Sequence, residues 1–265
     1  MEPELTEPVS LTLPDGRLNR AAVGWATQPI VDTSGLAHGR GRNKRWEYWN
    51  IATPSHITVS HIDYATVPEI WVYDRSTGES RGGAATVIPP RGTVLAPTLE
   101  RGRSMTRAKN LAIDIDEVSG GKSADSGAAD DAAGSDETVG TRLRMAMPGV
   151  SLGVVATPPV GGPWGDTGLQ CAVEDLARPA TGVLTIDGVD HEVGGAAGEA
   201  WAVLDHGRGR WPYDVQWNWG AASGRVQRAG GRVIGLQVGA KCTGWIGGGA
   251  SAVSVDVPVD AVPGK

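Results

Sequence analysis

The chain has 265 residues, of which 40% are hydrophobic and 20% are charged, and its formal net charge is −6. These values are typical of a globular protein with one large domain or two modest ones. The acidic charge argues against nucleic acid as a partner, because phosphate contacts need a broad surface of Lys and Arg.

Several other classes of protein are disfavoured by simple features of the sequence. No apolar run is long enough to span a bilayer, and the acidic N-terminus does not resemble a signal peptide. Two cysteines indicate neither a disulfide framework nor a zinc site. We therefore expect a cytoplasmic protein without a transmembrane segment; the sequence indicates no cofactor and no metal, and it leaves the oligomeric state open.

Turn-forming residues and tryptophan dominate the composition. The chain holds 39 Gly and 17 Pro, and its aromatic residues are 10 Trp, 4 Tyr and no Phe. The turn formers favour many short strands over long helices. Because a buried indole N–H needs a partner, a chain that relies on Trp for bulk has either an unusual core or a Trp-lined cavity.

Before residue 119, alternating apolar residues predict a series of strands. In chain order they are expected over residues 48–51, 57–61, 70–73, 84–88 and 111–116, with the third and fourth forming a hairpin. Residues 119–140 are almost entirely Gly, Ser, Ala and Asp, which is typical of a flexible low-complexity linker or loop.

Beyond this segment the strand pattern resumes. Strands are expected over 142–147, on both sides of the turn Asp187-Gly188, and over 234–238. No amphipathic helix is found, and residues 171–176 could form one helical turn at most. The predicted fold class is all-β, with two antiparallel β-barrel or sandwich units, residues 1–118 and 141–265. One barrel interrupted by a loop is the alternative.

The segment from Trp201 to Gly220 carries the first candidate site. In a strand that ends near His206, Trp201 and Asp205 share a face. Asp205 is the candidate general acid or ligand anchor, its pKa raised by nearby Trp, and Arg208 is its expected partner. The candidate ligand contacts in this segment are Trp201, Trp211, Tyr213, Trp217, Asn218 and Trp219. The competing interpretation is a loop-fixing Asp205–Arg208 ion pair beside core tryptophans.

A second candidate cluster is formed by Trp46, Glu47 and Tyr48. On a strand, Trp46 and Tyr48 face one way, and Glu47 faces the other way together with Trp49. Glu47 is therefore a candidate buried carboxylate, although a charge-paired Glu on a barrel exterior explains the pattern equally well. The five histidines show no metal-binding spacing.

The same two clusters carry a family resemblance. The relevant motifs are Gly24–Pro29, Lys44–Trp49, His61–Tyr64, Ala202–Asp205, Gly207–Gly209, Trp211–Tyr213 and Trp217–Gly224. They resemble an uncharacterised bacterial family, domain of unknown function 2804, from about residue 7 to about residue 241. That family is more loosely similar to lipocalin-like proteins such as hydroxyneurosporene synthases and tocopherol cyclases. The resemblance implies lipocalin-like β-units and isoprenoid or lipid-like substrates.

The sequence departs from the family pattern in three respects. His206 stands where the family commonly has Phe, residues 242–251 differ from the usual motif, and members continue through further strands beyond Lys265. We therefore expect the second β-unit to be incomplete, in a degenerate or truncated copy.

The expected function is the binding of a hydrophobic small molecule in a Trp-lined β-cavity, with isomerisation or cyclisation as a further option. The alternatives are a carbohydrate-binding β module, and a structural protein or a degenerate copy without function. Whether the protein is an enzyme is left open.

Overall fold

The computed structural model describes residues 3–27, 29–36, 43–63, 67–87, 92–96, 102–119, 138–157, 164–167, 170–210, 219–238, 242–246 and 253–255. Within these ranges every regular element is a β-strand or a single turn of 3-10 helix. The short turns are η1 Arg20–Ala22, η3 Gly195–Ala197 and η4 Gln227–Ala229. The predicted all-β class is confirmed.

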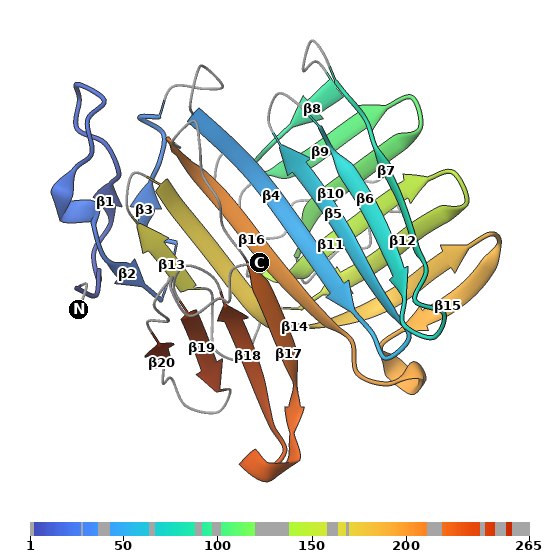
Figure 1. Ribbon diagram of the computed structural model, residues 1–265. Coiled ribbons are helices and arrows are strands. Elements are labelled where there is room, and N and C mark those ends of the chain that lie inside the picture. The colour runs from blue at the N-terminus through green and yellow to red at the C-terminus, as the bar shows by residue number, and fades with distance from the viewer. Residues whose placement is uncertain are drawn as a thin grey trace, which may run out of the picture.

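One large antiparallel sheet forms most of the molecule (Figure 1). Its strand order is β7-β6-β5-β4-β16-β14-β12-β11-β10-β9-β8. The bounds are β4 Asn43–Ala52, β5 His56–Asp63, β6 Glu69–Asp74, β7 Ser80–Ala84, β8 Thr93–Val94, β9 Arg103–Ala108, β10 Leu111–Ser119, β11 Thr138–Met147, β12 Val150–Ala156, β14 Gln170–Ile186 and β16 Trp201–Arg210. Strands β4 and β16, far apart in sequence, therefore lie side by side.

Smaller elements extend this sheet or pack beside it. Strands β13 Trp164–Thr167 and β15 Val189–Val193 pair with β14, and β2 Trp25–Ala26 pairs with β13. A parallel pair near the N-terminus consists of β1 Val9–Ser10 and β3 Val31–Asp32. A separate four-stranded sheet consists of β17 Gly220–Val226, β18 Arg232–Val238, β19 Cys242–Ile246 and β20 Val253–Val255.

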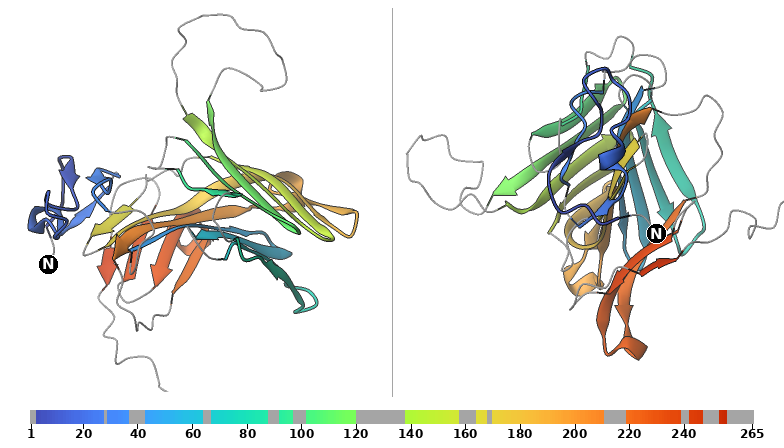
Figure 2. Two further views of the ribbon diagram at one scale, coloured as in Figure 1. Left: turned by 90° about the horizontal axis from the view of Figure 1, so that it is seen from above. Right: turned by 90° about the vertical axis from the view of Figure 1, so that its left-hand side faces the viewer.

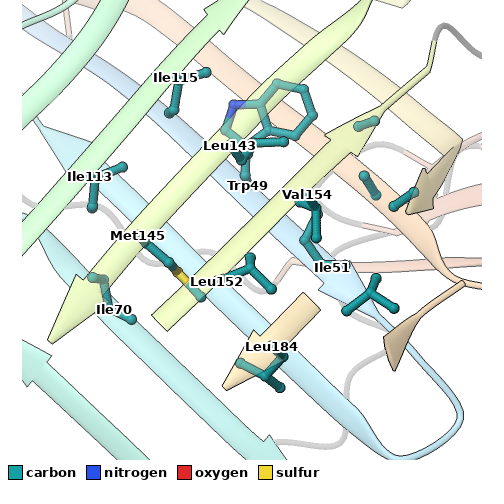
Figure 3. Packing of buried hydrophobic residues seen from close by; sticks show 14 of the residues in the cluster. Trp49, Ile51, Ile70, Ile113, Ile115, Leu143, Met145, Leu152, Val154 and Leu184 are labelled. Atoms are coloured by element: carbon teal, nitrogen blue, oxygen red, sulfur yellow. The ribbon is translucent and has the colours of Figure 1, made fainter. Parts of the chain in front are cut away.

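The core lies between two layers of the curled sheet. On β4, every second residue from Glu47 to Ile51 is buried, which matches the two-residue period of a half-buried strand. Figure 3 shows Trp49, Ile51 and Ile70 of one layer packed against residues of the other layer. Those residues are Ile113, Ile115, Leu143, Met145, Leu152, Val154 and Leu184. Complete burial of one such aliphatic side chain contributes about 1.5–3 kcal/mol, so this cluster holds the layers together.

Strand β14 joins the two layers. Its first half pairs with β16 and its second half pairs with β12 and β15. The register shifts between Asp175 and Arg178, and Ala177 has a φ of 54°, which is unusual for a residue with a side chain. The buried guanidinium of Arg178 donates to the carbonyl of Ala156 at 2.9 Å and to Asp175 at 3.1 Å. It thereby fixes the strand at its bulge.

The four-stranded sheet packs against β14 and β16, on the side that faces away from the core (Figure 2). The backbone N–H of Ala177, in the bulge of β14, donates to Ser223 Oγ at 3.1 Å. Arg225 of β17 pairs with Glu199 at 2.6 Å. This sheet therefore covers part of the outer face, a name used below for the core-distant face of β16, β4, β5 and β6.

Several local predictions are corrected by the structure. The hairpin that follows β6 returns at β7, Ser80–Ala84, and not at 84–88, because the Asp74 side chain accepts from Ser76 N at 2.7 Å and closes the turn early. Residues 171–176 belong to β14 and are not helical. The Asp187-Gly188 hairpin is confirmed, with φ values of 50° and 82°. The division into units 1–118 and 141–265 stays a prediction, although strand pairs β4–β16 and β10–β11 cross it.

Candidate functional site

The strand register brings the two sequence clusters together on the outer face. Strand β16 pairs with β4 so that Asp205 lies opposite Tyr48 and Gly207 lies opposite Trp46. Directly opposite residues in an antiparallel pair point to the same face of the sheet. The indole Nε1 of Trp46 donates to Asp205 Oδ1 at 2.9 Å. The carboxyl group is therefore held by an aromatic residue from the other cluster.

Gly207 makes this contact possible. A Cβ atom added at Gly207 would lie 1.9 Å from Cζ2 of the Trp46 ring, closer than any real contact. The indole thus lies across β16 at a position where that strand has no side chain. The sequence predicts a strand that ends near His206, but β16 continues through Arg210 and includes Gly207. The signal that could have found it is a Gly two residues from the candidate acid on an extended strand.

Tyr48 is the centre of an aromatic group on this face. Its ring makes an edge contact with Trp219, with centroids 5.3 Å apart, and it lies 6.4 Å from the His61 ring. Register also places His61 opposite Tyr48, and Glu69 opposite His61. A row of ionisable residues, Asp205, Tyr48, His61 and Glu69, therefore crosses four strands. His61 was not among the predicted site residues, because the pairing that brings it here joins distant segments.

Burial of three residues of this row, Asp205, Tyr48 and His61, shifts their pKa values in the direction that favours the uncharged form of each side chain. Burial raises the pKa of Asp205 from 3.8 to about 6, against the opposing effect of the Trp46 hydrogen bond. Burial also raises the pKa of Tyr48, an effect that the Asn50 hydrogen bond opposes and the Asp205 charge reinforces. Burial lowers the pKa of His61, against the nearby charges of Asp63 and Glu69. At pH 6 to 7, Asp205 can thus exist as either acid or base.

Glu47 lies on the opposite face, in the interior of the sheet. It is buried, and its carboxylate accepts from Trp49 Nε1 at 2.9 Å and from Ser104 Oγ. The buried-carboxylate interpretation is therefore correct in its geometry, whereas the charge-paired exterior alternative is not. Since Glu47 and Asp205 point away from each other, they do not form one site.

Arg208 also points to the interior and does not lie beside Asp205 as expected. Residues three apart on a strand face opposite sides. The Arg208 guanidinium donates to the backbone carbonyls of Trp46, Gly207 and Ala96 at 2.7, 2.8 and 3.0 Å. It therefore ties β16 to β4 and to the chain after β8. The neighbouring His206 is buried as well, and burial with the charges of Arg208 and Arg45 lowers its pKa well below 6.5.

The remaining predicted contacts fall into two groups. Trp201 lies buried on β16, on the same face as Asp205. Trp219 lies against Tyr48, and its buried indole N–H has no hydrogen-bond partner among the described residues. The predictions for Trp211, Tyr213, Trp217 and Asn218 lie outside the described residues.

Three other kinds of feature could carry function in the described part of the chain: a pocket away from Asp205, a metal site or a membrane-spanning helix. A pocket between the N-terminal segment and β16 is lined by Leu11, Thr12, Gly16, Arg17, Leu18, Leu36 and Arg210. Across the described ranges, no group of three or more His, Cys, Asp or Glu side chains is arranged to hold a metal ion. Nor does any helix in those ranges have the length and apolar character needed to cross a membrane.

Comparison with known proteins gives a family and two similar solved structures. A putative AttH from Nitrosomonas europaea has 12% identity, with 84% of this chain and 74% of that chain covered and a TM-score of 0.47. Kievitone hydratase from Nectria haematococca has 11% identity, with 83% and 67% covered and a TM-score of 0.45. No curated protein matches this chain. The model of the family described as Domain of unknown function (DUF2804) matches residues 2–256, and the chain belongs to that family.

Proposed function

We propose that this protein binds a hydrophobic small molecule on the outer face, against Tyr48 and Trp219, and that Asp205 donates a proton to it. The observation that carries the proposal is the Asp205 carboxyl group, held by Trp46 and only half-buried, with its pKa raised to about 6. A carboxyl group with this proton affinity is suited to general acid catalysis near neutral pH.

The aromatic surroundings suit an apolar ligand better than a charged one. Tyr48 and Trp219 offer ring surface, and ring faces also stabilise a developing positive charge. Protonation of a carbon–carbon double bond by Asp205 would generate such a charge. The carboxylate would then recover a proton from a neighbouring carbon, so that isomerisation or cyclisation consumes no co-reactant.

The indole N–H of Trp219 supports a polar group on the same ligand. Among the described residues this buried donor has no acceptor, and a buried donor left unpaired costs about 1–3 kcal/mol. A ligand hydroxyl or carbonyl oxygen would satisfy it. The ligand class that fits is therefore an unsaturated hydrocarbon skeleton that carries an oxygen.

Fluorescent cis-parinaric acid tests this binding directly. We expect its emission to rise on mixing with the protein, and retinol to displace it. Trp219→Ala should weaken binding at least ~10-fold, since one aromatic contact and one donor are lost. Trp71→Ala, on β6 and away from Asp205, is the matched control and should bind like the parent protein. Absence of any emission change in a cooperatively folded protein would overturn the proposal.

A second candidate function, carbohydrate binding, is favoured by one specific observation. Trp71 and Tyr73 share the outer face of β6 and are 45% and 40% exposed. The Trp71 ring lies over Gly82, where an added Cβ would come within 2.2 Å of it. Its Nε1 donates to Glu69 at 3.4 Å. A flat, exposed ring beside a carboxylate acceptor can stack on a sugar.

The two candidates give opposite patterns in one set of titrations. If soluble oligosaccharides bind and Trp71→Ala abolishes that binding, while parinaric acid leaves the protein unchanged, the carbohydrate function is supported and the hydrophobic ligand is excluded. If retinol displaces parinaric acid and oligosaccharides have no effect, the hydrophobic ligand is supported and the carbohydrate function is excluded.

A further inference from the structure

The Asp205 carboxyl group is held by Trp46, whose ring lies over Gly207, and neither of these two residues titrates. Trp46 lies on β4 and Gly207 on β16, directly opposite each other. Asp205 lies two residues before Gly207, on the same face of β16. The indole crosses the glycine to reach the acid, with its Nε1 2.9 Å from Asp205 Oδ1.

The same construction occurs a second time on this face. Trp71 of β6 lies opposite Gly82 of β7, its ring covers the glycine, and its Nε1 donates to the Glu69 carboxylate. The second pair is exposed at the edge of the sheet. The chain thus contains a matched control for the geometry, because in both pairs the ring lies over a glycine but only the Trp46–Gly207 pair holds Asp205.

We propose that Gly207 and Trp46 are positioning residues, which together fix Oδ1 of Asp205 by one indole hydrogen bond and leave Oδ2 to carry the proton toward the ligand. The proposal rests on the function proposed above only in the identity of that ligand. Among the described residues no donor contacts Oδ2. An indole donates but cannot accept, so Trp46 can bind only the unprotonated oxygen and thereby selects which oxygen is free.

The physical consequence is a limit on how strongly the acid holds its proton. Burial favours the neutral carboxyl, and a hydrogen bond donated to the carboxylate favours the charged form. Without the indole, the proton would be held more tightly and the acid would be a weaker donor at neutral pH. If Trp46 acted only through the burial that its ring provides, replacing it by Phe, which keeps a ring, would leave the pKa of Asp205 unchanged.

The test is the titration of Asp205 followed by its side-chain carboxyl 13C shift, assigned by comparison with Asp205→Asn. Trp46→Phe keeps the ring and removes the donor, so we expect the pKa of Asp205 to rise by about 1 pH unit. Gly207→Ala displaces the indole and should raise it by a similar amount. The double variant should show no further rise, because both changes remove the same bond.

Gly82→Ala is the control for strain in a Trp–Gly pair, and it should leave the Asp205 titration unchanged. If Trp46→Phe titrates like the parent protein, or if the two single changes add fully in the double variant, the positioning proposal is overturned. Parinaric acid binding is measured on the same samples. Binding without a change in titration refutes the positioning proposal alone, whereas the expected titrations without binding refute the ligand and leave the positioning role standing.

Discussion

Replacement of Asp205 by Asn should make the folded protein more stable at neutral pH. The change preserves the size of the side chain and leaves an oxygen that can accept from Trp46, but it removes the charge. Burial raises the pKa of Asp205 from 3.8 to about 6. A group whose pKa is higher in the folded protein stabilises the fold fully below pH 3.8, and this contribution is lost as the pH rises through 6.

The size of the effect follows from the same interval. At about 1.4 kcal/mol per pH unit, the rise from 3.8 to about 6 corresponds to about 3 kcal/mol. Because Asp205 is only half-buried, solvent screening reduces this to about 2 kcal/mol. Above pH 7 the Asn variant should therefore resist unfolding by about 2 kcal/mol more than it does at pH 4, relative to the parent protein.

Urea unfolding, followed by Trp emission at five values between pH 4 and pH 8, measures this difference. Subtraction of the parent free energy of unfolding cancels the titration of all other groups. Asp190→Asn, an exposed change on β15, controls for the loss of one negative charge and should lack a step near pH 6. A difference that stays constant from pH 4 to pH 8, or an Asn variant less stable than the parent at pH 8, would refute the buried-acid reasoning.

Two further predictions concern the core. The rings of His56 and His191 lie 4.6 Å apart, and burial, reinforced by His191 against the opposing charge of Asp74, lowers the pKa of His56. The free energy of unfolding should therefore fall as the pH drops below 6.5, because His56 of the unfolded chain takes up a proton before His56 of the folded protein does. His191→Gln should reduce the accompanying fall in Tm, because it removes the charge repulsion between the two rings. An identical fall in Tm in both proteins would contradict this effect of His191 on His56. Arg178→Leu removes the donor to Asp175, Ala156 and Thr141 and should cost about 3–5 kcal/mol in urea unfolding, with Arg178→Lys restoring only part. A loss below about 1 kcal/mol would show that the β14 bulge does not depend on this guanidinium.

Side-chain alternation within single strands could be predicted from the sequence. The assignment of Glu47 to one face and of Trp46 and Tyr48 to the other is confirmed by their burial. Trp201 and Asp205 share a face because they lie opposite Ala52 and Tyr48, which point to the same side of β4. These inferences need only the two-residue period of a strand.

Which strands pair could not be predicted in the same way. Trp46 and Asp205 are 159 residues apart, and no local pattern indicates that β4 lies beside β16. The expected partnership of Asp205 and Arg208 does not form because β16 continues past His206, and an extended strand sends side chains three residues apart to opposite faces. The glycine is explained by the indole of a distant strand, and this information is absent from the segment itself.

The pairing of β4 with β16 also sets an order of events during synthesis. Strands β4 to β7 are made well before β16 and can form hairpins, but β4 keeps one edge without its partner until residue 210 has been made. Contacts of such large sequence separation form slowly, and an open edge invites pairing with other chains. The hydrogen bond from Trp46 to Asp205 can therefore form only after most of the chain has been translated, and until then this edge of β4 is open to pairing with other chains.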